Sequence, residues 1–132
     1  MNIRKINANN YEENVVLAVN PVLINMRSNL CKQCDDTERL LMEIADEYSD
    51  IVDILELNLE LQPELTELFE VQRLPMIVMM TGGVVTKKVY GVPNKKDFIE
   101  DMELETIRDF KSRGINYHPK RNYIPDYIRN EF

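Results

Sequence analysis

Several residue types that would identify a protein class are scarce in this chain of 132 residues. It contains two cysteines, Cys31 and Cys34, one histidine, His118, and no tryptophan. A chain of this size does not need disulfide staples, so we expect the cysteines to have a chemical role. Tetrahedral zinc requires four ligands, and one distant histidine does not complete a pair of thiolates. We therefore expect no metal site in a single chain, although two chains could share one.

Long hydrophobic runs are also missing. The longest, residues 15–19 and 76–80, are far below the ~20 apolar residues that span a bilayer. The first residues lack the apolar core of a secretory signal. We therefore expect a cytoplasmic protein with no membrane partner.

Basic residues are outnumbered by acidic ones. The chain has 16 Lys and Arg against 23 Asp and Glu, which gives a net charge of −7. An acidic surface repels phosphate backbones, so we expect no nucleic-acid partner. The remaining composition, 44% hydrophobic and 30% charged, is typical of a soluble globular domain.

The hydrophobic periodicity predicts a single α/β domain. Short β-branched or alternating runs indicate strands, and apolar stripes at helical spacing indicate helices. The expected strands are 3–6, 21–26, 51–57, 76–80 and 84–90, and the expected helices are 11–16, a segment from the cysteines to 48, 63–69 and 94–113. Strand–helix–strand steps make parallel pairs, and the hairpin at Gly82 and Gly83 adds an antiparallel pair. We predict a mixed sheet with helices on both faces, in the order β-α-β-α-β-α-β-β-α.

Two of these helices have recognisable details. The helix after residue 62 begins with Pro63 and is expected to bury Leu65, Leu68 and Phe69. The last helix is expected to run without a break from an N-cap at residue 94 to a stop at residue 114.

The C-terminal end differs in composition from the rest. Residues 1–113 form the expected domain, and residues 114–132 form an extension with two prolines and three tyrosines. The first 103 residues carry a net charge of −9 and the remainder +2, so the two parts attract one another. We expect the extension to pack on the domain or to contact partners. The side chains expected to make these contacts are Tyr117, Tyr123, Ile124, Tyr127, Ile128 and Phe132.

The two cysteines form the motif Cys31-Lys32-Gln33-Cys34 at the junction of a strand and a helix. Unpaired N–H groups at the helix N-terminus stabilise a thiolate at the first cysteine, so we expect Cys31 to be the nucleophile. A cysteine one turn later can attack the mixed disulfide, which makes Cys34 the resolving thiol. A shared metal site and a redox-silent motif are the alternatives.

The chain from about residue 3 to 103 resembles the thioredoxin family. The matching elements are C-x-x-C after the second strand, Ile44-Ala45-Asp46-Glu47-Tyr48, Leu57-Asn58-Leu59-Glu60, Leu74-Pro75 and Gly91. The resemblance implies the thioredoxin fold and a protein disulfide oxidoreductase whose redox-active disulfide replaces a bound cofactor. It also implies protein substrates with disulfides, and a reductase or thiol pool that restores the dithiol.

The resemblance assigns further site residues. It implies a cis peptide before Pro75, close to the cysteines, and a substrate contact through the backbone of Leu74. Arg73 stands where the family commonly has glycine, and we expect it to influence partner choice. Lys32 lies inside the motif, where the family's intervening pair tunes the redox potential.

The acid that takes the proton of the resolving cysteine is missing from its usual place. That buried Asp corresponds to Asn25, and the Lys that often accompanies it corresponds to Glu56. We expect Glu56, with its pKa raised by burial, to be the general base for Cys34. A solvated Glu56 without this role is the alternative.

The charges near Cys31 oppose one another, because Lys32, Arg27 and Arg73 favour its thiolate while Asp35 and Asp36 disfavour it. A protein-binding module, with the same fold but no redox activity, is the alternative to the enzyme. It would use the groove and the C-terminal extension for partners. We make no prediction of oligomeric state.

Overall fold

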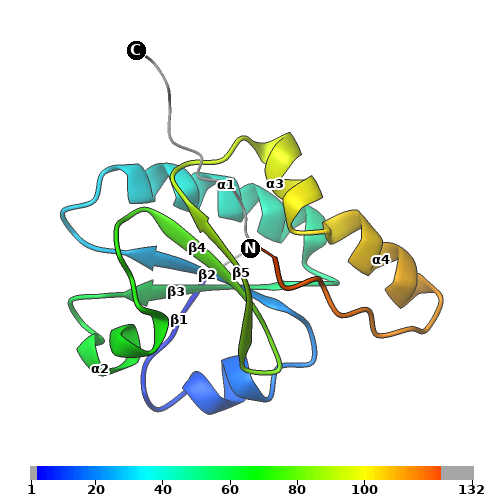
Figure 1. Cartoon of the computed structure of the whole chain (residues 1–132), viewed down its shortest axis with the longest axis horizontal. Helices are drawn as coiled ribbons and strands as arrows, with labels where there is room; N and C mark the ends of the chain where they lie inside the picture. The colour runs from blue at the N-terminus through cyan, green and yellow to red at the C-terminus, as the bar shows by residue number, and fades with distance from the viewer. Residues whose placement is uncertain (1–2, 123–132) are drawn as a thin grey trace.

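The computed structural model describes residues 3–122. Five strands and several helical segments alternate along the chain, as Figure 1 shows. In chain order they are β1 (Arg4–Lys5), a π-helical turn η1 (Glu12–Val16), β2 (Val22–Arg27), α1 (Gln33–Tyr48), β3 (Asp53–Asn58), α2 (Pro63–Thr66), a 3-10 turn η2 (Glu67–Phe69), β4 (Met76–Thr81), β5 (Val84–Tyr90), α3 (Lys95–Asp101) and α4 (Leu104–Ser112).

The strands form one mixed sheet in the order β1-β3-β2-β4-β5. β1, β3 and β2 are parallel, and β4 is antiparallel to both β2 and β5. The predicted fold class and order of elements are confirmed. β2 lies at the centre, so the residues that follow it are held by a strand with partners on both sides.

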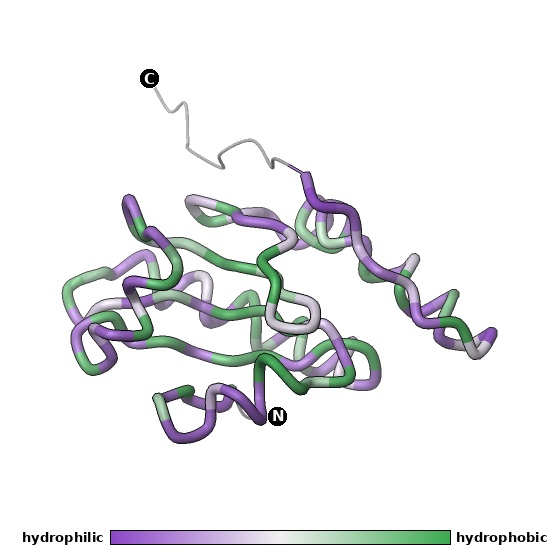
Figure 2. Tube along the Cα trace, turned by 60° about the horizontal axis from the view of Figure 1, so that its bottom comes forward, coloured by the Kyte–Doolittle hydropathy of each residue, from purple (hydrophilic) through white to green (hydrophobic). Residues whose placement is uncertain are grey.

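Side chains alternate between the two faces of the sheet, and each face has its own hydrophobic core. On one face α1, α3 and α4 cover residues such as Leu23, Ile77 and Val89. On the other face η1, α2 and η2 cover residues such as Ile24 and Val78. Figure 1 shows the two helical layers above and below the sheet, and in Figure 2 hydrophobic stretches of the chain follow the central strands.

The hairpin between β4 and β5 turns on two glycines. Gly82 has φ +57° and Gly83 has φ +81°, so both adopt the left-handed conformation predicted for this turn. An added Cβ on Gly83 would lie 3.4 Å from the Cα of Val16. The hairpin therefore closes against the turn η1.

Two predicted details are wrong. Leu68 is 62% exposed, because the helix from Pro63 changes to a 3-10 turn after Thr66 and rotates this side chain away from the core. The single helix expected from residue 94 is two helices, separated at Glu103, whose φ is +59°. The predicted N-cap is confirmed, since the Asn94 side chain accepts a hydrogen bond from the Asp97 N–H.

The residues after α4 lie against the domain as far as the structure describes them. The Tyr117 ring stacks on Phe110 at 4.9 Å, and its hydroxyl donates to Glu103. The Asn122 N–H donates to the carbonyl of Thr86 on β5 at 3.3 Å. Tyr123, Ile124, Tyr127, Ile128 and Phe132 lie outside the described residues.

Candidate active site at the Cys31–Cys34 pair

A short loop connects the end of β2 to the first turn of α1 and carries the first cysteine. Glu60 holds this loop, because its carboxylate accepts from the Ser28 hydroxyl at 3.1 Å and from the Asn29 N–H at 2.8 Å. The Cys31 N–H donates to the Ser28 carbonyl at 3.1 Å. Leu30, beside the cysteine, is 88% exposed. The predicted strand–helix junction is confirmed.

Cys31 and Cys34 form a disulfide, with their Cα atoms 5.4 Å apart. The two sulfurs have different surroundings. Cys31 is partly exposed, and its Sγ accepts the backbone N–H of Cys34 at 3.2 Å. Cys34 is fully buried, and its Sγ lies 3.6 Å from the carbonyl oxygen of Met26. An N–H group stabilises negative charge and a carbonyl oxygen opposes it, so the pair is asymmetric.

Asn25 lies under the first turn of α1 and is completely buried. Its Oδ1 accepts from the Thr37 hydroxyl at 2.9 Å, and that hydroxyl is also 2.9 Å from the Cys34 carbonyl. Its Nδ2 has no hydrogen-bond partner among the described residues. Sequence reasoning missed Thr37, although a hydroxyl three residues after Cys34 on the buried stripe of a helix signals a polar contact.

Glu56 is adjacent to Asn25 in the parallel pairing of β2 and β3. It is 8% exposed, and burial together with a hydrogen bond to Glu38 raises its pKa above the ordinary value, while the charge of Arg27 opposes this shift. A groove of about 410 Å³ reaches Glu56 and is also lined by Lys5, Arg27 and Glu38. The expected burial and raised pKa of Glu56 are therefore present. Asn25, the register neighbour of Glu56, is linked through the Thr37 hydroxyl to the Cys34 carbonyl.

The Leu74–Pro75 peptide is cis, as the resemblance implied. Pro75 directly precedes β4, whose first residue, Met76, pairs with Met26 at the end of β2. The Pro75 carbonyl accepts the Gly91 N–H at 3.0 Å. This register places Leu74 and Pro75 at the same end of the sheet as the cysteine loop.

Two of the cations expected near Cys31, Arg27 and Arg73, contact other side chains. Arg27 binds Asp35 at 2.7 Å and Glu38 at 2.8 Å, so its charge is compensated. The Arg73 guanidinium lies 4.2 Å from the centre of the Tyr90 ring. Lys32 is exposed at the start of α1.

No group of three or more His, Cys, Asp or Glu side chains in residues 3–122 is arranged to hold a metal ion. Within the same residues, no helix combines the length and the apolar character that crossing a membrane requires.

Comparison with known proteins agrees with this geometry. The family model described as Thioredoxin matches residues 2–104. A thioredoxin of Staphylococcus saprophyticus is 28% identical over 103 residues, which cover 78% of this chain and 97% of that protein. A thioredoxin of Alicyclobacillus acidocaldarius is 29% identical over 76 residues, covering 58% of this chain and 72% of the relative. A bifunctional thioredoxin reductase/thioredoxin of Mycobacterium leprae is 27% identical over 82 residues, covering 62% of this chain and 18% of that protein. With the family model matching most of its length and a C-x-x-C disulfide at the start of α1, this chain belongs to the thioredoxin family and is a thiol–disulfide oxidoreductase.

Proposed function

We propose that Cys31 is the attacking thiolate and Cys34 the resolving thiol in the exchange of disulfides with partner proteins. The observation that carries this assignment is the asymmetry of the pair. Cys31 is partly exposed and its sulfur accepts an N–H group from the first turn of α1, whereas the Cys34 sulfur is buried beside a carbonyl oxygen. The first environment favours a thiolate and the second a thiol.

The reaction follows in two balanced steps. The Cys31 thiolate attacks one sulfur of the partner's disulfide, so a mixed disulfide forms and the other partner sulfur leaves as a thiolate. Cys34 then loses its proton and attacks the Cys31 sulfur, which releases the second partner thiolate. Two electrons pass to the partner, and the Cys31–Cys34 disulfide remains.

Glu56 is the proposed acceptor of the Cys34 proton. It is a buried carboxylate with a raised pKa, and it borders a groove of about 410 Å³. Asn25 is the register neighbour of Glu56 on β2, and we propose that a water molecule carries the proton from Cys34 past it to Glu56. Asn25 and Thr37 fix the first turn of α1, and Lys32 tunes the redox potential from the exposed side.

Leu74 and Pro75 are the proposed contacts to the partner's polypeptide, with Arg73 as a selector of partners. The register of β4 with β2 supports this proposal, because it brings the segment to the end of the sheet where Cys31 lies. Arg73 stacks on Tyr90 beside that segment, which presents its guanidinium at the border of the site.

The proposed setting of the reaction is the cytoplasm. Members of the thioredoxin family act on protein disulfides, and a separate reductase or thiol pool would return this chain to its dithiol. No bound cofactor is needed for the exchange itself, and no nucleic acid or membrane takes part. Residues 1–113 form the catalytic domain and residues 114–132 an extension.

The direct experiment is to capture the mixed disulfide. Cys34→Ser should accumulate a covalent adduct between Cys31 and a protein that carries a disulfide, and mass spectrometry should locate the bond at Cys31. Cys31→Ser, which keeps the buried cysteine, is the matched control and should form none. Equal adduct formation at Cys34 would reverse the assignment, and no adduct in either variant would favour the redox-silent binding module.

A further inference from the structure

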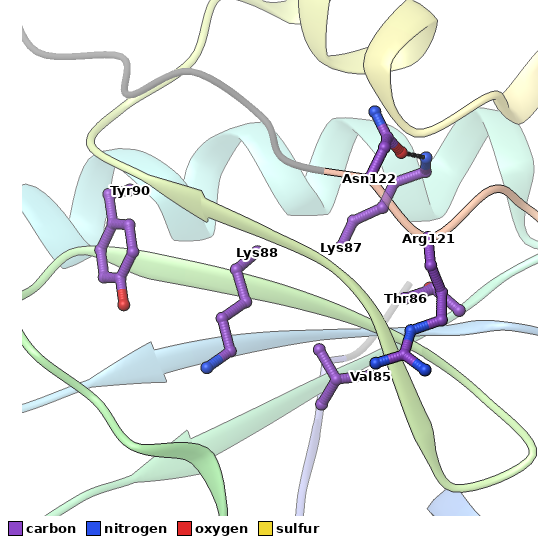
Figure 3. Close-up of a pocket in the computed structure, with 7 residues that line it drawn as sticks. All are labelled: Val85, Thr86, Lys87, Lys88, Tyr90, Arg121 and Asn122. Carbon is purple, nitrogen blue, oxygen red and sulfur yellow. Dashed lines mark hydrogen bonds between the residues drawn. The ribbon is translucent and has the colours of Figure 1, made fainter.

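A hollow of about 390 Å³ lies along the outer edge of β5, next to the last described residues of the chain. Figure 3 shows the side chains of Val85, Lys88 and Tyr90 along the strand, and Arg121 and Asn122 reaching it from the C-terminal segment. Because β5 is the last strand in the order β1-β3-β2-β4-β5, this edge has no neighbouring strand among the described residues. The C-terminal segment thus forms one wall of a groove whose other wall is a strand edge.

The backbone of β5 is oriented to accept an added strand. The Gly91 N–H points to Pro75 on the β4 side, and peptide groups alternate in direction along a strand. The N–H and C=O groups of Lys88 and Tyr90 therefore point outward. The carbonyl of Thr86 does so as well, since it accepts the Asn122 N–H. An extended peptide can continue this ladder across the groove.

The side chains of the groove give it a positive charge. Among the described residues, Lys88 and Arg121 are its cationic groups and no acidic residue lines it. A third cation, Lys87, is compensated by Glu103 at 2.8 Å. The apolar parts come from Val85 and Tyr90. In a chain with a net charge of −7, this groove is a local exception that suits an extended segment with acidic side chains.

One end of the groove borders the active site. Tyr90 pairs with Met76, the residue after Pro75, and the Arg73 guanidinium lies over the Tyr90 ring. Two strand spacings, roughly 10 Å, separate β5 from β2, which leads to Cys31. A polypeptide that crosses Leu74 and Pro75 therefore reaches the groove within a few residues.

We propose that the β5 edge groove is a second binding site for the protein substrate and takes an extended acidic segment of it near the reacting cysteine. This inference rests on the proposed function. It gives the C-terminal segment a role in substrate choice, because Arg121 is one of the cationic side chains that line the groove among the described residues.

The test uses peptide disulfides reduced by the full-length dithiol protein. One peptide carries alternating Glu and Val after its cysteine, a second carries the same stretch before it, and each has a partner with Gln in place of Glu. We expect kcat/KM for at least one acidic peptide to exceed that of its Gln partner by roughly three- to tenfold, the effect of one or two exposed ion pairs. This preference should shrink as salt concentration rises.

Variants locate the effect. Arg121→Gln should remove most of the preference for acidic peptides, and Lys88→Gln should reduce it further. Lys96→Gln removes the same charge from exposed α3 and should leave the preference intact. The proposal is overturned if the unaltered protein shows no preference for acidic peptides. It is also overturned if Arg121→Gln keeps the same preference as the unaltered protein.

Two controls separate the possible failures. Hydroxyethyl disulfide is small and uncharged, so its reduction reports the exchange reaction alone. If the unaltered protein failed to reduce it, the proposed function would be refuted, and not merely the binding of substrate in the groove. The chain's own Asp126 and Glu131 are a competing source of acidic groups. If Asp126→Asn with Glu131→Gln raised the rate for acidic peptides several-fold, the groove would belong to the chain's own end and the proposal would be wrong.

Discussion

Cys31 and Cys34 differ in what surrounds each sulfur, although only two residues separate them. The Cys31 sulfur faces the N–H of Cys34, and the Cys34 sulfur faces the Met26 carbonyl inside the protein. These contacts support the proposed order of reaction. In that order the partner's disulfide reacts first with the outer sulfur, and the inner sulfur then attacks the mixed disulfide.

Alkylation of the reduced protein provides a check at this scale. Brief treatment with iodoacetamide at neutral pH should modify Cys31 well before Cys34, because Cys31 is partly exposed and its sulfur accepts an N–H group, whereas Cys34 is buried. Peptide mapping by mass spectrometry measures the ratio. Preferential modification of Cys34 would contradict the assigned roles.

Glu56→Gln tests the proposed base. Because burial and Glu38 raise the pKa of Glu56, resolution of the mixed disulfide should accelerate as the pH rises through that pKa. The variant should lose this rise in rate with pH and resolve the mixed disulfide at least roughly tenfold more slowly. Stopped-flow release of a thiol from the Cys31 adduct measures the rate, and exposed Glu64→Gln is the matched control.

Glu56→Gln should slow the reaction without lowering the stability of the fold. A carboxyl group with a raised pKa in the folded state stabilises the fold at low pH, and this contribution is lost as the pH rises through the folded-state pKa. Above the folded-state pKa the ionised Glu56 therefore destabilises the fold, and at such pH the Gln variant should be at least as stable as the unaltered protein. A slower reaction with unchanged or higher Tm would identify a chemical role. An unchanged resolution rate would remove Glu56 from the mechanism.

At the scale of elements, the β4–β5 hairpin depends on conformations that side chains rarely adopt. Gly83→Ala should lower the free energy of unfolding by about 1–2 kcal/mol, because φ is +81° and the new methyl group would lie against Val16. Gly82→Asn is the matched change and should cost less than about 0.5 kcal/mol, since asparagine tolerates φ +57° and space is open there. Urea unfolding measures both, and equal costs would contradict the contact with η1.

The elements that sequence predicted correctly are those set by local pattern. Short, nearly continuous apolar runs at 22–27 and 76–81 specify strands buried on both faces, and the capping side chain of Asn94 specifies a helix start. The break at Glu103 was missed because its cause is distant in sequence. Lys87, Tyr117 and Lys120 all bind its carboxylate, which favours a turn where the local pattern continues a helix.

The site shows the same division between local and distant causes. The position of Cys31 follows from the strand and helix on either side of it, and sequence reveals both. The contacts that compensate Arg27 depend on Asp35 and Glu38, which face it only once α1 packs on the sheet. The charge near Cys31 is therefore a property of the packed structure, and residue types alone did not determine it.

At the scale of the whole molecule, one buried ion pair joins β5, the α3–α4 junction and the C-terminal segment. The Lys87 side chain is 1% exposed and binds Glu103 at 2.8 Å, the Lys120 carbonyl at 2.7 Å and the Asn122 side chain. Glu103 also accepts the Lys120 N–H at 2.9 Å. Burial raises the pKa of Glu103, but the hydrogen bonds from Lys87, Tyr117 and Lys120 outweigh this and hold it below the ordinary value.

Glu103→Gln should weaken this connection in a pH-dependent way. A carboxyl group with a lowered folded-state pKa contributes stability above its unfolded-state pKa, and this is lost as the pH falls through the folded-state value. The variant should therefore be less stable by roughly 1–3 kcal/mol at neutral pH, with a smaller difference in acid. Trypsin should also cleave faster after Lys120 and Arg121. Glu100→Gln, on exposed α3, is the control, and equal behaviour of the two variants would contradict a role for the ion pair in holding the segment.

The redox equilibrium of the cysteine pair tests the central claim most directly. The protein would be equilibrated across a series of glutathione ratios, and its thiols trapped and counted by mass. A two-electron transition that involves both cysteines and disappears in Cys31→Ser is the predicted result. A midpoint near about −270 mV would indicate a reductase, and one near about −180 to −120 mV an oxidant or isomerase. A pair whose oxidation state stays the same across the series would contradict the account.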